Sequence, residues 1–319
     1  MPILKTMLAT SAAAALMLSG AHAAHVAYAL GNGGNTLVSF GADSPDDASG
    51  SSITLGGTTL TLDAITFRPE TGELYGYSAS NNAFYTVDPM TGVATLEFQS
   101  DVDLPGGNVS FDFNPTLDAV RIVTANRDNI VFFPEDSRTA ANQGVLTFAP
   151  ADIFYDEGYT ANGPVQIVGN GYTNQIGFDA AQDTGTVQYV LDARTDTIGI
   201  LNNNDGDVDF VMDAMIDTDG DGVGDDALSF NVIGGFDVFT SPAGDNVGYA
   251  VLNGTEFYEL DLGTFVFTLI GEVDGGFGNL RSLAVFVPNA APVPIPAAGA
   301  LFAFGAAGLV TARRRKGRA

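Results

Sequence analysis

Cysteine is absent from the 319 residues, and lysine occurs only near the two ends, at Lys5 and Lys316. Without cysteine the chain can form no disulfide, and thiol catalysis and cysteine-based zinc or iron–sulfur sites are excluded. A phosphate-binding glycine loop with its lysine is excluded because the body of the chain has no lysine. Histidine is scarce as well, and only His25 follows the first 23 residues. It would lie beside a new N-terminus, where disorder is usual, so a Ser-His-Asp triad is not expected.

Positive charge is also scarce in the central part of the chain. The formal net charge is −26, but six of the twelve basic residues lie within residues 1–23 and 291–319. Residues 24–290 therefore carry six Arg against 38 acidic residues, a net charge of −32. A nucleic-acid-binding face needs clustered Lys and Arg, so nucleic acid is excluded as a partner. Such acidity suits a solvated surface in a salty or calcium-containing medium, and solubility alone is the simpler explanation.

The first 23 residues have the three parts of a secretory signal peptide. Lys5 supplies the positive region, residues 7–18 the short apolar region, and Ala21 and Ala23 the small residues of the cleavage site. The apolar run is too short for an N-terminal membrane anchor. We therefore expect the secretion machinery and signal peptidase to be partners of this segment.

The last 29 residues have a different three-part arrangement. A proline-rich segment, residues 291–297, leads into an apolar stretch, residues 298–312, and then into a basic cluster, residues 313–316. The apolar stretch is marginal as a membrane span, for which about 20 residues are usual. The basic cluster would remain on the cytoplasmic side. The pattern predicts a short transmembrane helix with an Arg-rich end.

This arrangement resembles the VPLPA-CTERM and PEP-CTERM sorting signals of Gram-negative bacteria. The signature residues here are Val293, Pro294, Ile295, Pro296 and Ala297, with Ile where that family usually has Leu. The resemblance implies recognition by an exosortase-type protease after transient anchoring in the inner membrane. Removal of the tail would then deliver the protein to the cell surface or the extracellular matrix. A permanent C-terminal anchor is the alternative.

The body of the chain repeats a short strand of the form apolar-x-apolar before a turn. The five instances are centred on residues 66, 112, 179, 237 and 284, so they lie 46 to 67 residues apart. Periods of about 40–50 residues are typical of propeller blades, and the two longer intervals contain insertions at 134–164 and 202–226. No stretch shows a sustained helical period.

The two ends of the body complement each other. Strands at 25–30 and 36–40 have no first strand before them, and the strand at 281–287 has none after it. Pairing them would close a ring without a free sheet edge. The sequence thus predicts an all-β fold, one β-propeller over residues 24–290 with about five blades, or six if 134–164 contains another. A two-sheet sandwich is the competing architecture.

The body resembles the uncharacterised domain-of-unknown-function family 4394, propeller-like domains of exported bacterial proteins. The resemblance depends on residues 65–76 (ITFRPETGELYG), 84–95 (FYTVDPMTGVAT), 111–115 with 120–123, 235–237 and 280–284. It covers nearly all of the mature domain. Because that family has no assigned activity, the resemblance implies a fold and adds no mechanism.

An acidic stretch, DTDGDGVGDD at residues 217–226, matches the first half of an EF-hand-type calcium loop. The candidate ligands are the carboxylates of Asp217, Asp219, Asp221 and Asp225 and the backbone carbonyl of Val223. The twelfth position has Leu228 instead of Glu, so the loop resembles the calcium loops of thrombospondin type-3 repeats more than a complete EF-hand. Close carboxylates repel without a cation, which favours a structural Ca²⁺ over a disordered acidic loop.

A recurrent aspartate forms a second constellation, at Asp112, Asp179 and Asp237. Equivalent positions on the inner strands of a ring could converge near its axis, where carboxylates could hold a catalytic metal. The alternative is a repeated structural Asp that bonds backbone groups within its own blade. We prefer the alternative, because repetition is what structural roles produce.

These observations leave three functional hypotheses. The first is a non-enzymatic exported surface or matrix protein, a calcium-stabilised module that binds glycans, matrix polymer or other surface proteins. The second is a metal-dependent lactone or ester hydrolase with its ion in the central channel. The third is a purely structural envelope component without a small ligand.

Overall fold

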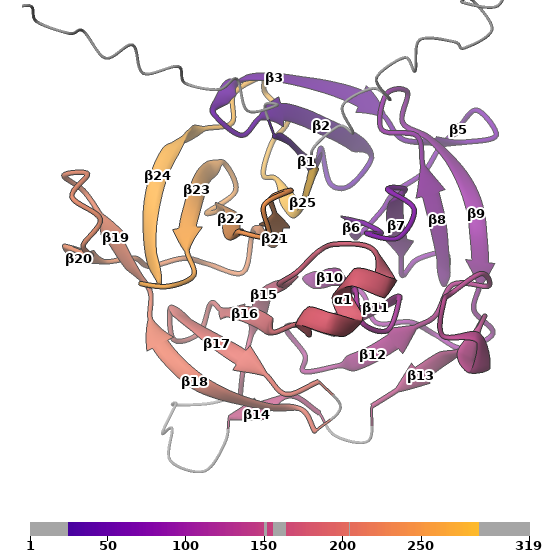
Figure 1. The fold of residues 1–319 in the computed structure, drawn as a ribbon. Helices are drawn as coiled ribbons and strands as arrows, with labels where there is room; N and C mark the ends of the chain where they lie inside the picture. The colour runs from indigo at the N-terminus through magenta and orange to yellow at the C-terminus, as the bar shows by residue number, and fades with distance from the viewer. Residues whose placement is uncertain (1–24, 150–151, 156–163, 204, 287–319) are drawn as a thin grey trace, which may run out of the picture.

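The computed structural model describes residues 25–149, 152–155, 164–203 and 205–286, and these residues form a five-bladed β-propeller (Figure 1). Within them, no helix has the length and apolar character needed to cross a membrane. The predicted signal peptide and the predicted sorting tail lie outside the described residues. The prediction of an all-β propeller is confirmed, and the sandwich alternative is wrong.

The four main strands of each blade form an antiparallel sheet whose first strand lies nearest the central axis, and three blades add a short strand in parallel at the outer edge (Figure 1). These inner strands are β6, β10, β15, β21 and β25, with bounds Ala64–Phe67, Val109–Asn114, Ile167–Tyr172, Gly235–Thr240 and Arg281–Phe286. Nearly all of their residues are buried, because each strand is covered by its own sheet and by the neighbouring blades.

The remaining strands complete the blades outward from the axis. Blade 1 continues from β25 with β1 (Val26–Gly31), β2 (Thr36–Gly41) and β3 (Ser44–Ser52). Blade 2 continues from β6 with β7 (Leu74–Ser78), β8 (Ala83–Val87) and β9 (Val93–Gln99), and carries the small strands β4 (Thr54–Leu55) and β5 (Thr58–Thr59). Blade 3 continues from β10 with β11 (Ala119–Thr124), β12 (Asn129–Phe132) and β13 (Leu146–Phe148).

Blades 4 and 5 follow the same plan. Blade 4 continues from β15 with β16 (Gln188–Asp192), β17 (Thr197–Leu201), β18 (Asp207–Asp213) and β14 (Phe154–Tyr155). Blade 5 continues from β21 with β22 (Asn246–Leu252), β23 (Glu256–Asp261) and β24 (Val266–Glu272), and carries β19 (Met215–Asp217) and β20 (Asp226–Ala227).

Blade 1 closes the ring by joining the two ends of the domain. Strand β1 pairs antiparallel with β25, from Val26 opposite Phe286 to Ala29 opposite Leu283. This is the predicted pairing of the N-terminal and C-terminal strands, and it is confirmed. Because residues 25–286 include all five sheets and the closing pair, this segment forms a complete ring on its own.

Blade 2 shows why the chain turns where it does. After β8, the Oδ1 of Asp88 accepts hydrogen bonds from the N–H groups of Met90 and Thr91, an Asx-type turn. Gly92 then adopts a φ of +72°, and a Cβ at this position would lie 2.5 Å from the backbone oxygen of Ser52. Only glycine satisfies both conditions, so the Pro-Met-Thr-Gly sequence defines this corner.

The hydrophobic core is divided among the five interfaces between blades. Five clusters of buried side chains each combine residues from two neighbouring blades. Between blades 2 and 3, for example, the rings of Phe84 and Phe132 stack with centroids 4.1 Å apart, beside Tyr77 and Phe111. Burial of such aromatic surface is the main source of stability for the ring.

One sequence prediction about the blades is corrected. Residues 178–180 do not form an inner strand; they begin helix α1 (Phe178–Thr184), and β15 is the inner strand of blade 4. The prediction failed because β15 contains Gly169 and Gly171, which interrupt the apolar pattern. Both glycines are required by packing, since a Cβ on either would lie within 3 Å of Phe236.

A sixth blade is not found in the described part of the insertion 134–164. That part contains the 3-10 helix η1 (Ala140–Asn142), the outer strand β13 and the small strand β14. The insertion therefore supplies the edges of blades 3 and 4, and the structure has five blades.

Candidate functional site

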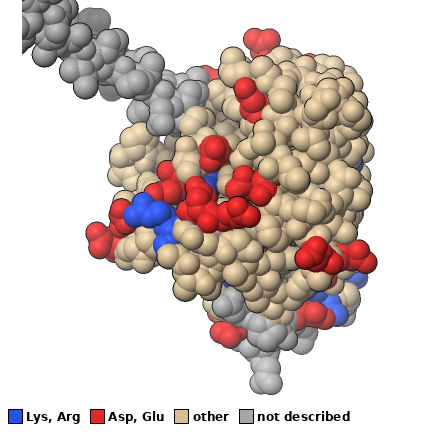
Figure 2. Space-filling model, turned by 90° about the vertical axis from the view of Figure 1, so that its right-hand side faces the viewer, with Lys and Arg blue, Asp and Glu red and all other residues tan. Residues whose placement is uncertain are grey.

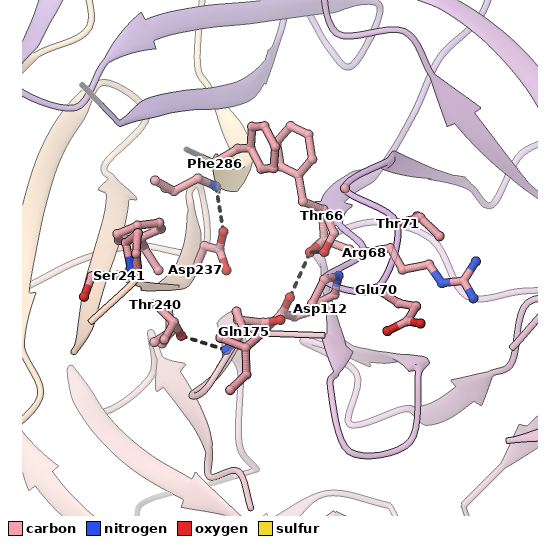
Figure 3. A pocket seen from close by; sticks show the side chains of 18 residues that line it. Thr66, Arg68, Glu70, Thr71, Asp112, Gln175, Asp237, Thr240, Ser241 and Phe286 are labelled. Atoms are coloured by element: carbon pink, nitrogen blue, oxygen red, sulfur yellow. Dashed lines mark hydrogen bonds between the residues drawn. The ribbon is translucent and has the colours of Figure 1, made fainter. Parts of the chain in front are cut away.

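A cavity of about 430 Å³ lies at the ends of the inner strands (Figure 3). Its walls come from the C-terminal parts of β6, β21 and β25, the turn after β6, Asp112 of β10, and residues 175–176 after β15. The inner strands end on the same side of the ring, so their last side chains meet there. The volume lies within the range of pockets for small ligands.

Asp112 is buried in this cavity, with 1% of its surface exposed. Its Oδ1 accepts hydrogen bonds from Oγ1 of Thr66 and from the N–H of Phe113, both at 2.8 Å. Its Oδ2 accepts from the N–H of Tyr172 at 2.6 Å and from Nε2 of Gln175 at 2.7 Å. Thr66 belongs to blade 2 and Tyr172 to blade 4, so this carboxylate joins three blades.

Asp237 points into the cavity from the other side of the opening (Figure 3). It is 5% exposed, and its Oδ2 accepts a hydrogen bond from the N–H of Val285 at 2.6 Å. That bond joins blade 5 to blade 1. The sequence analysis preferred structural aspartates that bond backbone groups within their own blade. Most hydrogen bonds of Asp112 and Asp237 instead join neighbouring blades.

The two carboxyl groups share an environment that disfavours negative charge. Burial raises the pKa of Asp237 to about 6, although the N–H groups of Val285 and Val238 oppose the shift. Burial and the charge of Asp237 together raise the pKa of Asp112, against the hydrogen bond from Tyr172. Because the two groups interact, their protons are lost in steps that belong to the pair.

The nearest guanidinium group serves another purpose. Arg68 lines the cavity, but its side chain points away from it (Figure 3). Its guanidinium forms a two-point contact with Asp118, at 2.6 and 2.8 Å, and a further salt bridge to Asp136 at 2.7 Å. Among the residues that the structure describes, no salt bridge joins Asp112 or Asp237 to an arginine.

Gln175 is a residue of the site that the sequence analysis missed. Its Nε2 donates to Asp112 and to the backbone oxygen of Phe113, at 2.7 and 3.0 Å. Its Oε1 is buried and is without a hydrogen-bond partner. A single Gln after a glycine-containing strand belongs to no recognisable motif, so no sequence signal identified it.

The cavity also has an apolar wall. The rings of Phe67 and Phe286 stack at 4.5 Å and line it together with Phe239. Behind Phe239 lies His25, with ring centroids 4.1 Å apart and its Nδ1 3.3 Å from the hydroxyl of Tyr249. The expectation of a disordered His25 is therefore wrong, and this histidine packs behind the apolar wall.

Asp179 is the one member of the aspartate constellation that does not reach the cavity. It lies in the first turn of α1 and is exposed, and Arg138 binds both of its oxygens at 2.9 and 3.0 Å. Arg138 also forms a salt bridge with Glu70, whose Oε2 accepts the N–H of Phe178. These contacts fix α1 next to the mouth of the cavity. The prediction that Asp179 shares the site of Asp112 and Asp237 is wrong.

The predicted calcium loop forms the hairpin between β19 and β20. Asp217, Asp219 and Asp225 each offer a carboxylate oxygen, and these atoms lie within 4.8 Å of one another. The Oδ1 of Asp221 instead accepts the N–H of Val223 at 2.9 Å. The structure thus brings together three of the four predicted carboxylates, and the backbone carbonyl of Val223 as a ligand stays a prediction.

Backbone donors hold this loop in shape. Asp217 accepts hydrogen bonds from the N–H groups of Gly220 and Gly222, at 2.7 and 2.8 Å, and they lower the pKa of its carboxyl. The N–H and the hydroxyl of Thr218 lower the pKa of Asp225 in the same way. Carboxylate oxygens grouped on a tight loop are the kind of donors that a hard cation such as Ca²⁺ prefers, so these residues fit calcium.

The outer surface is acidic in patches. Figure 2 shows acidic side chains gathered on one side of the ring, with a smaller basic area beside them. One such group surrounds Glu97: burial, followed by the charges of Asp136 and Glu73, raises the pKa of its carboxyl.

Comparison with known proteins gives a family and a remote structural likeness. A solved structure of an auxiliary nutrient binding protein from Bacteroides ovatus is similar, with 13% sequence identity and a TM-score of 0.39. The alignment covers 70% of this chain and 55% of that protein, so the chain spans about half of the protein's length. No curated protein matches the sequence. A family model described as "Domain of unknown function (DUF4394)" matches residues 36–284, and the chain belongs to this family.

Proposed function

We propose that this protein is exported to the cell surface or the extracellular matrix and acts there as a binding module, with its ligand site in the channel cavity. The observation that carries the proposal is the cavity itself. It is formed by inner strands of a closed ring, its volume suits a small ligand or one unit of a polymer, and it combines an aromatic wall with buried polar groups. Stacked rings beside hydrogen-bonding groups suit glycans or matrix polymer.

The export part of the proposal depends on the two ends of the chain. The signal peptide at residues 1–23 and the sorting signature at residues 293–297 support delivery outside the cytoplasm. Signal peptidase and an exosortase-type protease would act on these ends.

Calcium would serve as a structural ion in this proposal. Asp217, Asp219 and Asp225 would hold it, and its charge would offset the mutual repulsion of their carboxylates. The ion would fix the β19–β20 hairpin at the outer edge of blade 5. It would lie on the outer part of the ring, apart from the channel cavity.

The hydrolase alternative is not carried further. It required carboxylates that are free to hold a metal at the axis. Only two of the three predicted aspartates line the cavity, and all the acceptor positions of Asp112 are used by donors of its own and neighbouring blades. The hydrogen bonds of Asp112 and Asp237 therefore favour a structural role, in which they join neighbouring blades, over a metal centre.

The test uses a variant that fills the mouth of the cavity. Thr71 is exposed and lines it, so Thr71→Trp should block entry while leaving the ring intact. Thr58→Trp is the matched control, because Thr58 is exposed on β5, away from the cavity. Binding of residues 24–290 to an array of bacterial surface glycans is measured for both variants and the wild type. We expect binding that Thr71→Trp weakens by about tenfold or more and Thr58→Trp does not.

Absence of glycan binding, or equal binding by the wild type and Thr71→Trp, would contradict the proposal. In the second case the ligand contacts another surface, and the cavity is not its site.

A further inference from the structure

The charge of the channel cavity is unbalanced. Asp112 and Asp237 are both nearly fully buried, and the described residues form no salt bridge to either. A buried carboxylate without a counter-charge is unfavourable, and two that face one cavity are more so. Glu70 also lines the cavity, but Arg138 neutralises it. The two channel aspartates thus lack what Glu70 has, a positive partner.

The hydrogen bonding of the cavity is also incomplete. The Oε1 of Gln175 is buried with no donor. Exchanging the oxygen and nitrogen of this amide would not help, because Oε1 would then face the carboxylate of Asp112 and the carbonyl of Phe113. The orientation of the amide is therefore set by its neighbours. A buried carbonyl oxygen is left to which no group of the described fold donates.

The acceptor atoms of the cavity that remain free indicate which kind of donor group a ligand must carry. Asp112 has four donors, so its oxygens are occupied. The carboxylate of Asp237, with its bond from Val285, keeps unused acceptor capacity. An ammonium group brings three N–H donors and a positive charge. It could therefore serve Asp237 and Gln175 together and offset the charge of the aspartate pair.

We propose that the cavity binds a small organic ammonium ion, with its charged group at Asp237 and Gln175 and its apolar part against the stacked rings of Phe67 and Phe286. This inference rests on the proposed function, whose cavity it uses, and names the chemical class of the ligand. An ammonium group near aromatic faces also gains from cation–π attraction.

A metal ion fits the same cavity less well. Calcium takes six to eight oxygen ligands, whereas the oxygens of Asp112, one of the two buried aspartates of the cavity, are already used by donors of the fold. A bare ion would also leave the aromatic wall without a partner. The donor set of the loop at Asp217, Asp219 and Asp225 is the better calcium site.

The test compares two probes of the same shape and different charge. Benzylammonium and benzyl alcohol are titrated by calorimetry into residues 24–290 at about pH 8, above the pKa of about 6 of Asp237. We expect saturable binding of benzylammonium and binding at least about tenfold weaker for benzyl alcohol. This comparison uses the unaltered protein, so it does not depend on the folding of any variant.

Two variants locate the site. Asp237→Asn keeps an oxygen for the N–H of Val285 and removes the charge, so the affinity for benzylammonium should fall by about tenfold or more. Asp192→Asn is the matched control, because Asp192 is also buried, accepts the backbone N–H of Gln166 and lies outside the cavity. It should bind the ammonium probe as the wild type does.

Three results of the ammonium titrations would overturn the inference. These are no benzylammonium binding up to about 10 mM, equal affinity for both probes, or equal affinity in Asp237→Asn and the wild type. Calcium binding that survives Asp219→Asn and is lost in Asp237→Asn would assign the cavity to a metal and also overturn it. Glycan binding that Thr71→Trp blocks, without ammonium binding, would leave the proposed function intact and reject only the ammonium class.

Discussion

The aspartates of the channel and those of the β19–β20 loop lie in opposite electrostatic surroundings. In the channel, burial raises the pKa of Asp112 and Asp237, and backbone donors only partly offset it. In the loop, backbone N–H groups lower the pKa of Asp217 and Asp225. The same residue type is therefore unfavourably charged in one region and favourably charged in the other.

The comparison separates two reasons for keeping acidic groups together. Backbone donors favour the charged forms of Asp217 and Asp225, so the proposed calcium ion would meet carboxylates held ready for it. The channel carboxylates reduce the stability of the unliganded fold when both are charged, whereas the hydrogen bonds of Asp112 stabilise it by joining three blades. Asp237 has fewer such bonds, and a charge kept at a cost in stability is typical of a functional residue.

The largest effect on stability is expected from removing the Asp112 carboxylate. It tests whether this channel aspartate holds the blades together. Asp112→Ala leaves the buried N–H of Tyr172 and one hydrogen of the Gln175 amide without an acceptor. Each such loss costs about 1–3 kcal/mol, so the free energy of unfolding should fall by about 2–6 kcal/mol. Urea denaturation of residues 24–290 measures it. A loss below about 1 kcal/mol would show that the carboxylate does not hold the blades together.

Asp237→Asn should raise the free energy of unfolding, and the size of this gain should depend on pH. The folded-state pKa of about 6 lies above the ordinary 3.8, so protonation favours the folded protein. The stability that this group contributes is complete below about pH 4 and is lost as the pH rises through about 6. The loss in the wild type amounts to at most about 3 kcal/mol.

The variant lacks this loss, so its free energy of unfolding should exceed that of the wild type at about pH 8 and approach it at about pH 4. Urea denaturation across this range, without ligand, checks the prediction. Asp192→Asn serves as the control for removing a buried charge elsewhere. An Asp237→Asn protein less stable than the wild type at about pH 8 would mean that the charge itself stabilises the ring.

Much of this fold could be predicted because its repeated unit is local. Turn sequences such as Pro-Met-Thr-Gly before Val93 mark the corners of blade 2, and strand alternation marks the strands between them. Ring closure followed from two incomplete ends, and the pairing of β1 with β25 confirms it. These features depend on residues that are neighbours in sequence or on a simple count of strands.

The parts that could not be predicted depend on packing between blades. Strand β15 has glycines where apolar residues were expected, because Phe236 of blade 5 occupies the space above them. The apolar-x-apolar pattern at residues 178–180 predicted a strand, but these residues begin helix α1. Asp179 therefore does not lie on an inner strand. Gln175 became recognisable only through the unpaired Oε1 in the folded cavity. None of these features produces a periodic pattern in the sequence, so none could be predicted from it.

The smallest expected effect on stability concerns the β19–β20 loop, whose aspartates are the ones with lowered pKa. Calcium at about ten times its dissociation constant should raise the free energy of unfolding by about 1.4 kcal/mol, because it binds the folded loop only. Asp219→Asn removes one of the three grouped carboxylates from an exposed position and should abolish this gain. Asp46→Asn, an exposed aspartate on β3, removes the same charge elsewhere and should keep the gain. Thermal unfolding with calcium and with a chelator measures the difference. If Asp219→Asn and Asp46→Asn respond equally to calcium, the ion acts through general screening of the acidic surface and the loop is not its site.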